Sequence, residues 1–446
     1  MKLYVYKWLL VVFAFAKAFT LVAQEDRPAE SLSLEQAISL ALESNKAIKI
    51  EQKRTEISEE QVSIGNAGLL PTLNLIGTVN YSNNDADLTI RTFQPTPPTV
   101  NFNESGVTST TMQGVLQADY TVFAGFSGKY RYKLLKGQNQ IAQYQQQAII
   151  NSTVRDVSEL FLEIAKLQRR QELLKETIKI ETDRISRISD QKQFGKATGL
   201  DVLRAESNLN RDKTSLDKVL LAKNNLKRNL NFLIGYEAER KYWVTTTYTI
   251  NELEDVATIK ADILANNPTL LLANQGIELA DTEINLSRSR NLPRLDVFAN
   301  YGYFNQENDV QQLAEITNIG YTVGGQLTFN IFNGNQTKKA IQTAKLRKEE
   351  SQLQQEQLSD RLITDAITEV NRIEILKEQL SREQQNIGSF EEAYTRTEER
   401  FKKGNATNLD LRDAQTALLN AQIIIAELQA DLMRSHIVLD TLRGKI

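Results

Sequence analysis

Two threonine–aspartate pairs stand in matching stretches of the sequence. GKATGLDVLRA begins at Gly195 and holds Thr198 and Asp201, and GNATNLDLRDA begins at Gly404 and holds Thr407 and Asp410. A Thr-x-x-Asp spacing fits a capping box, in which the acid stabilises the N-terminus of a helix. The sequence therefore predicts that a helix begins just after each threonine.

A third aspartate, Asp413, lies one helical turn beyond the second box, and Arg204 holds the corresponding position in the first stretch. Other reactive residues are few. His436 is the only histidine, with no acidic or thiol partner at ligand spacing, and such a residue is more often a packing or helix-surface residue than a ligand. The chain has no cysteine, and it has no P-loop, G-x-G-x-x-G or G-x-S-x-G motif. We expect no enzyme activity, no cofactor and no bound metal.

The net charge is −3 and the pI is about 5.7, so nothing suggests the basic surface that nucleic-acid binding needs. Residues 1–23 place Lys2 and Lys7 before an apolar run that ends in small residues, as in a secretory signal peptide. A membrane anchor is the alternative. However, only nine apolar residues separate Lys7 from Lys17, and a spanning helix needs about 20. We expect an exported protein that is not lipidated on cysteine.

The two stretches belong to a longer internal repeat. Their glycines are 209 positions apart, and so are Gly125 and Gly334, which end the motifs VFAG and IFNG. Further upstream the offset is 222, and it relates Pro71 to Pro293 and Asn45 to Asn267. Matching residues at fixed offsets indicate a tandem duplication of a unit of about 200 residues. We place the repeats at residues 24–233 and 263–446, with residues 234–262 between them as a collar around the middle of the helices.

Long helices are predicted in both repeats. No proline occurs from residue 99 to 267 or after 293, and proline is excluded from helix interiors. Apolar residues recur every 3.5 positions, as in a coiled coil, with Gln171 and Glu181 as the polar exceptions in the first seam. We expect long helices at 128–191 and 337–400, each roughly 96 Å long, and return helices at 200–233 and 409–442. The two quoted stretches are then the tips of helical hairpins.

Residues 72–123 and 294–332 are predicted β-hairpins. Leu73, Leu75, Val79 and Tyr81 alternate with polar residues, and three further segments alternate in the same way. This pattern is typical of transmembrane β-strands, although a soluble sheet with one face on a core gives the same alternation. Helices that extend far from the sheet would leave it no such core. The polar residues 82–110 and 305–318 are predicted to be exposed loops.

Four strands cannot close a barrel alone, because open edges would leave backbone groups unpaired in lipid. The smallest membrane barrels have about eight strands. If these strands span a membrane, several chains must therefore pool them, and the protein is an oligomer.

The order of these elements resembles the TolC-like outer-membrane efflux proteins. The residues that carry the resemblance are Leu70-Pro71 and Leu292-Pro293 before the strands, Phe123–Gly125 and Phe332–Gly334 after them, and the two hairpin tips. The resemblance implies a mixed, mainly α fold and a homotrimer. Its twelve strands would form one outer-membrane barrel, and its twelve helices would form a periplasmic tunnel. Such a protein is the exit duct for an inner-membrane pump joined through a periplasmic adaptor, or for type I secretion.

The resemblance also implies roles for the tips. Aspartates at the positions of Asp410 and Asp413 ring the narrow periplasmic entrance in relatives, and Asp201 and Arg204 on the other hairpin complete the expected gate. An adaptor would dock on the tips, through the small residues Gly195, Ala197, Thr198, Gly404, Ala406 and Thr407. The function is then a passive conduit for small molecules or proteins. The alternative is a structural coiled-coil protein of the envelope or a periplasmic adaptor, although adaptors usually have one hairpin flanked by compact β domains.

Overall fold

The structure is a computed structural model that describes residues 30–91, 99–245, 252–309 and 314–445. The predicted signal peptide, residues 1–23, lies outside the described residues. The chain forms two compact units: Met1–Glu51, Gln146–Pro268 and Ser359–Ile446 make up the first, and Gln52–Gln145 and Thr269–Leu358 the second. Most of the described residues are helical. The elements are β1 (Glu30–Leu32), α2 (Leu34–Ser44), α3 (Lys46–Gln61), β2 (Thr72–Arg91), β3 (Thr99–Ala124), α4 (Ser127–Gln193), α5 (Gly199–Ile234), β4 (Tyr242–Val244), α6 (Val256–Asn266), α7 (Pro268–Ser289), β5 (Arg294–Asn308), β6 (Glu315–Thr328), α8 (Gln336–Lys402) and α9 (Asn408–Arg443).

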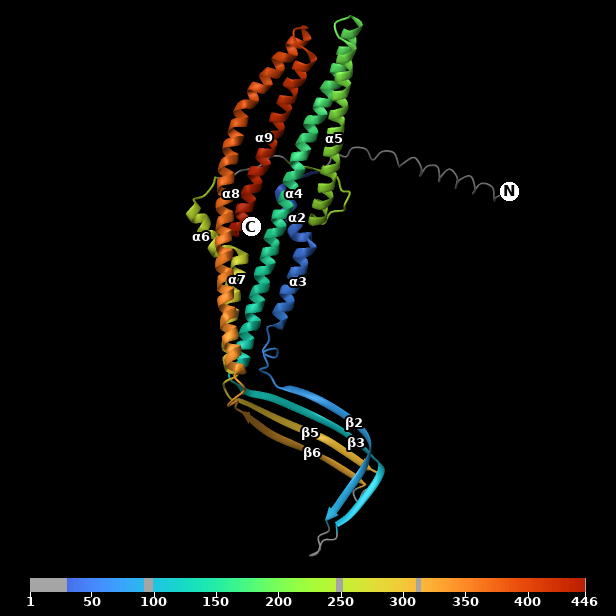
Figure 1. Ribbon diagram of the computed structural model, residues 1–446, viewed down its shortest axis with the longest axis vertical. Helices are drawn as coiled ribbons and strands as arrows, with labels where there is room; N and C mark the ends of the chain where they lie inside the picture. The colour runs from blue at the N-terminus through green and yellow to red at the C-terminus, as the bar shows by residue number, and fades with distance from the viewer. Residues whose placement is uncertain (1–29, 92–98, 246–251, 310–313, 446) are drawn as a thin grey trace, which may run out of the picture. The chain divides into compact units, whose positions relative to one another are not determined.

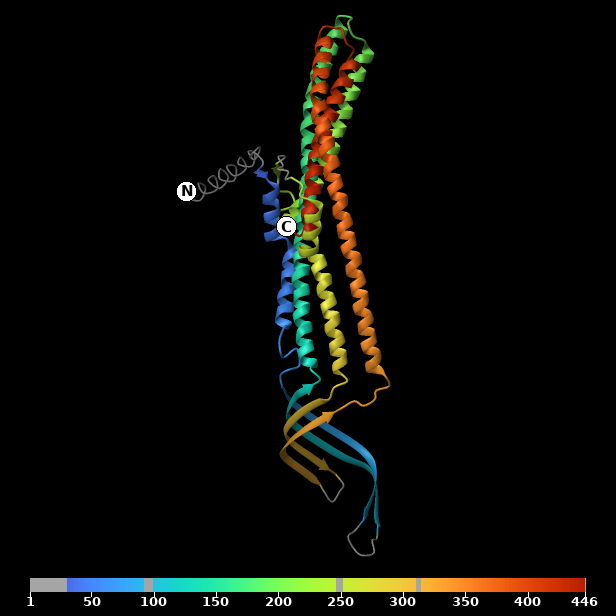
Figure 2. The same ribbon diagram turned by 90° about the vertical axis from the view of Figure 1, so that its left-hand side faces the viewer.

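The first unit contains two helical hairpins. The C-terminal part of α4 turns back as α5, and the C-terminal part of α8 turns back as α9 (Figures 1 and 2). Both long helices have 67 residues and both return helices have 36. The sequence predicted 128–191 and 337–400 for the former, which lie at 127–193 and 336–402.

The repeated asparagines hold the ends of the return helices. The side-chain amide of Asn45 donates to the carbonyl of Leu233 near the end of α5, at 3.0 Å, and that of Asn267 donates to Leu442 in α9, at 2.8 Å. Both asparagines are buried. A helix leaves its last four carbonyls without partners inside the helix, so each asparagine satisfies one of them. This explains why the residue recurs in both halves of the sequence.

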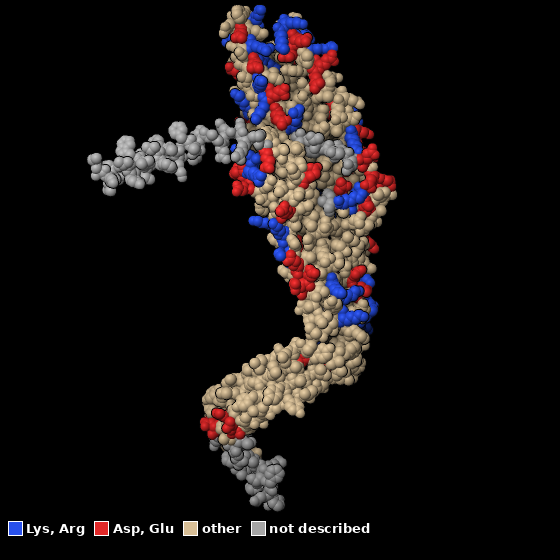
Figure 3. Space-filling model, turned by 180° about the vertical axis from the view of Figure 1, so that it is seen from behind, with Lys and Arg blue, Asp and Glu red and all other residues tan. Residues whose placement is uncertain are grey.

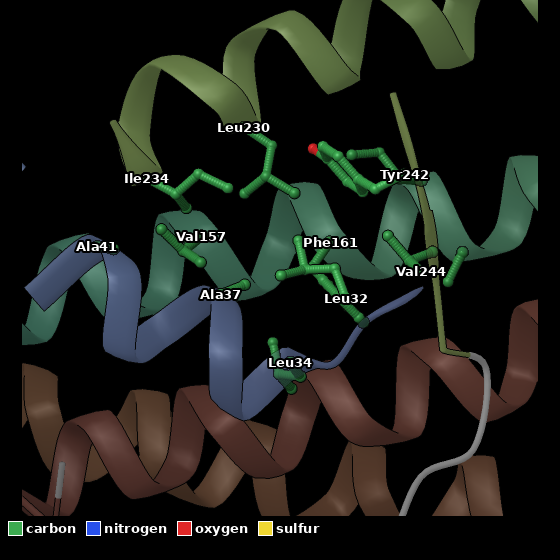
Figure 4. Packing of buried hydrophobic residues seen from close by; sticks show 12 residues of the cluster. Leu32, Leu34, Ala37, Ala41, Val157, Phe161, Leu230, Ile234, Tyr242 and Val244 are labelled. Carbon is green, nitrogen blue, oxygen red and sulfur yellow. The ribbon is translucent and has the colours of Figure 1, made fainter. Parts of the chain in front are cut away.

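A hydrophobic core joins α2, α4 and α5 to a small parallel sheet of β1 and β4. Phe161 of α4 is fully buried at its centre, among side chains of all these elements (Figure 4). Leu32 and Tyr242 bring the two strands into this cluster. Residues 234–262 were predicted to be a collar. Three of them, Ile234, Tyr242 and Val244, belong to this core.

The second unit contains a four-stranded antiparallel sheet in the order β2-β3-β5-β6 (Figure 1). The register aligns residues of one kind across all four strands. One row is Leu75, Leu116, Tyr301 and Tyr321, and the adjacent row is Asn74, Gln117, Asn300 and Thr322. Because neighbouring positions of a strand point to opposite faces, the sheet has one apolar and one polar face. The apolar face is solvent-exposed within the chain, with Leu75 and Tyr321 at 81% and 80% of full exposure.

The strands differ from the prediction at both ends. Residues 82–91 and 99–110, predicted as loop, continue the ladder of β2 and β3, and the second predicted loop is mostly strand up to Asn308 and again from Glu315. Polar residues pair through their backbones as well as apolar ones, so polarity did not mark the strand ends. In contrast, β6 ends at Thr328 rather than at residue 332. Thr328 pairs with Arg294, the first residue of β5, so the residues beyond it have no strand to pair with on that side.

A sharp turn leads from β3 into α4 at the motif Phe-Ala-Gly. Gly125 has a φ of +59°, and a Cβ there would lie 2.3 Å from the carbonyl oxygen of Ser289 at the end of α7. The close approach and the left-handed backbone both require glycine. Gly334 has the same conformation in the second half, at φ +63°.

Within the described part of the chain, none of the helices has a stretch long and apolar enough to span a membrane.

Candidate functional site

Both hairpin tips have the same geometry. α4 ends at Gln193 and α5 begins at Gly199 with Thr198 as its N-cap, while α8 ends at Lys402 and α9 begins at Asn408 with Thr407 as its N-cap. The amide nitrogens of Asp201 and Asp410 donate to the threonine hydroxyl oxygens, at 3.3 and 3.1 Å. The threonine amide nitrogens donate to the aspartate carboxylates in return, at 2.9 and 2.8 Å. Two capping boxes are therefore present.

These bonds determine the charge of the two aspartates. Hydrogen bonds from the Thr198 hydroxyl and amide lower the pKa of Asp201, and the nearby charge of Arg204 lowers it further. Bonds from the Thr407 amide and hydroxyl lower the pKa of Asp410. Both carboxylates are therefore ionised at neutral pH, and each has a structural task at the start of its helix.

Asp413 and Arg204 lie farther along the return helices. Both side chains are exposed. Arg204 stands three residues after Asp201 on its own helix, where its positive charge acts on that carboxylate. In the described part of one chain, Arg204 therefore acts on Asp201 through its charge.

The small residues of the tips are placed by backbone and packing demands. Gly195 and Gly404 have φ of +71° and +77°, and nothing lies within 4 Å of a Cβ added at either position. Glycine is therefore favoured there by the left-handed backbone and not by the close approach of another residue. Ala197 and Ala406 are half-buried against a cluster in which all four hairpin helices meet, formed by Ile188, Ala205, Phe401 and Leu411.

Sequence reasoning missed a buried ion network below the tips. Arg412 of α9 makes a bidentate pair with Asp212 of α5, with both N–O distances 2.8 Å, and a further bond to Glu181 of α4, also at 2.8 Å. The side chain of Glu181 is fully buried, and those of Asp212 and Arg412 are 7% and 15% exposed. The network joins the second hairpin to both helices of the first.

Arg184 and Gln415 extend this network. The guanidinium of Arg184 pairs with Glu181 at 3.1 Å and donates to the side-chain oxygen of Gln415. Burial lowers the pKa of Arg184, and the charge of Glu181 partly offsets this effect. Burial also acts to lower the pKa of Arg412, but its bonds to Asp212 and Glu181 outweigh this effect and raise it. Glu181 is one of the two polar exceptions in the heptad seam, and that position was the signal for the network.

In the described residues, no group of three or more His, Cys, Asp or Glu side chains is placed to hold a metal ion. His436 lies half-buried in α9, and its burial lowers its pKa.

Comparison with known proteins decides the family. A sequence model of the family described as outer membrane efflux protein matches residues 37–236 and 261–445. The chain belongs to the outer membrane efflux protein family. Proteins of this family are outer-membrane channels that extend into the periplasm, rather than enzymes.

One sequence relative and two solved structures resemble the chain over most of its length. The chain is 23% identical over 425 residues to the alkaline protease secretion protein AprF of Pseudomonas aeruginosa, covering 93% of this chain and 84% of AprF. It is 17% identical to the outer membrane protein VceC of Vibrio cholerae, with a TM-score of 0.73 and coverage of 92% and 96%. It is 16% identical to the open state of the MtrE channel of Neisseria gonorrhoeae, with a TM-score of 0.70 and coverage of 92% and 88%. The structural matches show that the fold is that of these channels.

Proposed function

We propose that three copies of this chain, each built from two tandem repeats, form a continuous conduit through the outer membrane and the periplasm. The observation that supports this most is the sheet. It has four strands, one apolar exposed face and one polar face. Among the described residues, its edge strands β2 and β6 each pair with a neighbouring strand on one side only. In lipid every backbone group needs a partner. Three such sheets joined edge to edge close a barrel of twelve strands whose polar face lines a lumen.

The helical hairpins supply the periplasmic part of this proposal. An inner-membrane pump, joined through a periplasmic adaptor, drives small molecules or proteins into the tunnel, and the channel itself is passive. The likeness to AprF, whose name states that it serves protease secretion, supports a protein cargo. The likeness to VceC and MtrE concerns the fold alone.

Fractionation tests the proposal against a periplasmic coiled-coil protein or adaptor. We expect the chain in the outer membrane, resistant to carbonate extraction, as a trimer in mild detergent. A carbonate-soluble periplasmic monomer would contradict the proposal. Any signal peptide, and the absence of a lipid on cysteine, can be read from the N-terminus of the same preparation.

The gate proposal places Asp410 and Asp413 around the periplasmic entrance. In a trimer the two aspartates give six carboxylates near one axis, and their mutual repulsion favours cations or basic partners. Asp410 already caps α9, so the exposed Asp413 is the residue whose loss isolates the effect on ions. We expect Asp413→Ala to weaken cation preference and divalent block in single-channel recordings. Asp410→Ala with Asp413→Ala should weaken them further, and unchanged selectivity in intact trimers would assign the aspartates to helix capping alone.

Arg204 and the network around Arg412 would restrain the gate. Arg204 and Asp201 would belong to the ring of charges at the entrance, and Arg204→Ala should raise the conductance of the closed form. The buried bonds of Arg412 to Glu181 and Asp212 tie α9 to the first hairpin of the same chain. Opening that moves α9 outward must break them or carry the first hairpin along.

The tips would dock the adaptor through Gly195, Ala197, Thr198 and their counterparts Gly404, Ala406 and Thr407. Because the glycines are needed for the turns and the alanines for packing, the sharper test replaces exposed Lys196 and Asn405 with tryptophan. We expect lost adaptor binding and export with trimers intact. Normal adaptor binding by both variants would place the docking surface elsewhere.

A further inference from the structure

A small cleft in the first unit concentrates positive charge. It has a volume of about 240 Å³ and lies between the C-terminal half of α5 and the segment that leads into β4. Five of its ten lining residues are cationic and only one, Glu239, is acidic. The cations are Lys223, Lys227, Arg228, Arg240 and Lys241. The whole chain has a net charge of −3, so this excess is local.

In the described part of the chain, the arginines of the cleft form ion pairs, whereas the lysines at its base form none. Glu172 acts on Lys223 through its charge, but Lys175 opposes this effect and Glu172 is paired with Arg169. Arg228 pairs with Glu239 at 2.9 Å and Arg240 pairs with Glu30 at 2.7 Å. In contrast, the ammonium of Lys223 donates to the side-chain oxygen of Gln171, and that of Lys227 donates to the carbonyl of Tyr242. Both acceptors are neutral.

The two lysines are close together and shielded from water. They stand four residues apart on α5, where like charges repel each other. Lys223 is buried and Lys227 is partly buried. Burial, and next the charge of Lys223, lower the pKa of Lys227 to about 8. Two neighbouring ammonium groups that form no ion pair among the described residues favour a bound anion.

The indole of Trp243 completes the cleft. Both ammonium groups lie over its ring, with Nζ 5.2 Å from the ring centroid for Lys223 and 5.9 Å for Lys227. The side chain is 37% exposed. It therefore presents an apolar surface beside the two positive charges, on which the flat face of a bound ring can lie.

We propose that this cleft binds a phosphate group, either as free phosphate or as a phosphate monoester of a small ring-containing molecule. A phosphate carries a charge of about −1.5 to −2 at pH 7, which matches two neighbouring ammonium groups. Lysine binds phosphate as a point charge. The cleft, with a volume of about 240 Å³, has room for one such group and a small attached ring. The proposal does not rest on the channel function, because every residue of the cleft belongs to the first unit of one chain.

Tryptophan fluorescence can report binding directly. The chain has two tryptophans, Trp8 and Trp243, so a Trp8→Phe background leaves Trp243 as the only reporter whether or not residues 1–23 are removed. The purified protein is titrated in phosphate-free buffer with inorganic phosphate, with glucose 1-phosphate, and with chloride and acetate at equal ionic strength. We expect a saturable change with the two phosphates only. A lower midpoint for the ester would indicate a sugar ring on Trp243, and equal midpoints would indicate that phosphate alone is recognised.

Matched variants separate binding from general charge effects. Lys223→Gln with Lys227→Gln should raise the phosphate midpoint about tenfold or more. Lys213→Gln with Lys218→Gln removes the same charge from exposed positions of the same helix and should shift it less than about twofold. If the first double variant does not fold, Lys241→Gln at the exposed rim should still weaken binding measurably. Equal responses to phosphate and acetate, or an unchanged midpoint in the cleft variants, would overturn the proposal.

Discussion

Replacing Arg412 with leucine tests whether the buried network holds the second hairpin to the first. The substitution leaves Asp212 without its guanidinium partner and leaves Glu181 with Arg184 alone. The side chains of Glu181 and Asp212 are only 0% and 7% exposed. Removing one partner of a buried pair costs about 3–5 kcal/mol. Because Arg412 itself is 15% exposed, we take the lower end, about 3 kcal/mol.

Hydrogen–deuterium exchange of the first turns of α9 measures this cost. A loss of about 3 kcal/mol corresponds to exchange roughly 100-fold faster when the segment opens locally. Arg396→Leu is the control, because Arg396 forms an exposed pair with Glu392 within α8. An exposed i,i+4 pair contributes about 0.3–0.5 kcal/mol, so the control should change exchange about twofold. Equal effects of the two substitutions would refute the assignment of the network as the fastening between the hairpins.

Three further outcomes are expected. Phe161→Ala, at the centre of the core, should lower the free energy of unfolding in a denaturant titration by about 3–5 kcal/mol. Phe194 is 79% exposed at a hairpin tip, so Phe194→Ala should lower the same free energy by less than about 0.5 kcal/mol. Val297→Arg on the apolar face should lower the free energy of unfolding by about 2–4 kcal/mol if the residue lies near mid-bilayer. Gln326 lies on the polar face, opposite Asp296 in the sheet, so Gln326→Arg should lower it far less. Equal losses of stability in urea unfolding from vesicles would contradict the assignment of the two faces. Because the folded pKa of Asp410 lies below its unfolded value of about 3.9, its capping is complete above that pH and is lost as the pH falls through the folded pKa. Exchange in the first turn of α9, corrected for its intrinsic rate, should therefore rise at acid pH in the native chain, and Asp410→Ala should show the faster exchange at every pH.

The long helices could be predicted because two independent signals coincide over many residues. Proline is absent from both regions, and apolar residues fill most of nine successive seam positions, over about eight helical turns. The tip turns were found for a similar reason, since glycine at positive φ and a Thr-x-x-Asp box are local features. Strand ends were harder to place. Backbone pairing does not depend on side-chain polarity, so β2 and β3 continued through residues predicted as loops.

The buried networks depend on which helices meet, and that information is not local. Gln171 and Glu181 interrupt the apolar seam, and both are buried with cationic partners, Lys223 for the first and Arg412 and Arg184 for the second. A polar residue in a seam position thus indicated a partner, but its identity required the fold. Asn45 and Asn267 are similar, because their recurrence was visible while the carbonyls they bind were not.

The most direct test of the conduit is electrical recording from the purified protein in a planar lipid bilayer. We expect discrete conductance steps from trimers, with a preference for cations that weakens in the Asp410→Ala, Asp413→Ala variant. Membrane-inserted trimers that give no conductance steps, either alone or with the Arg204→Ala substitution that should loosen the closed form, would contradict the conduit proposal.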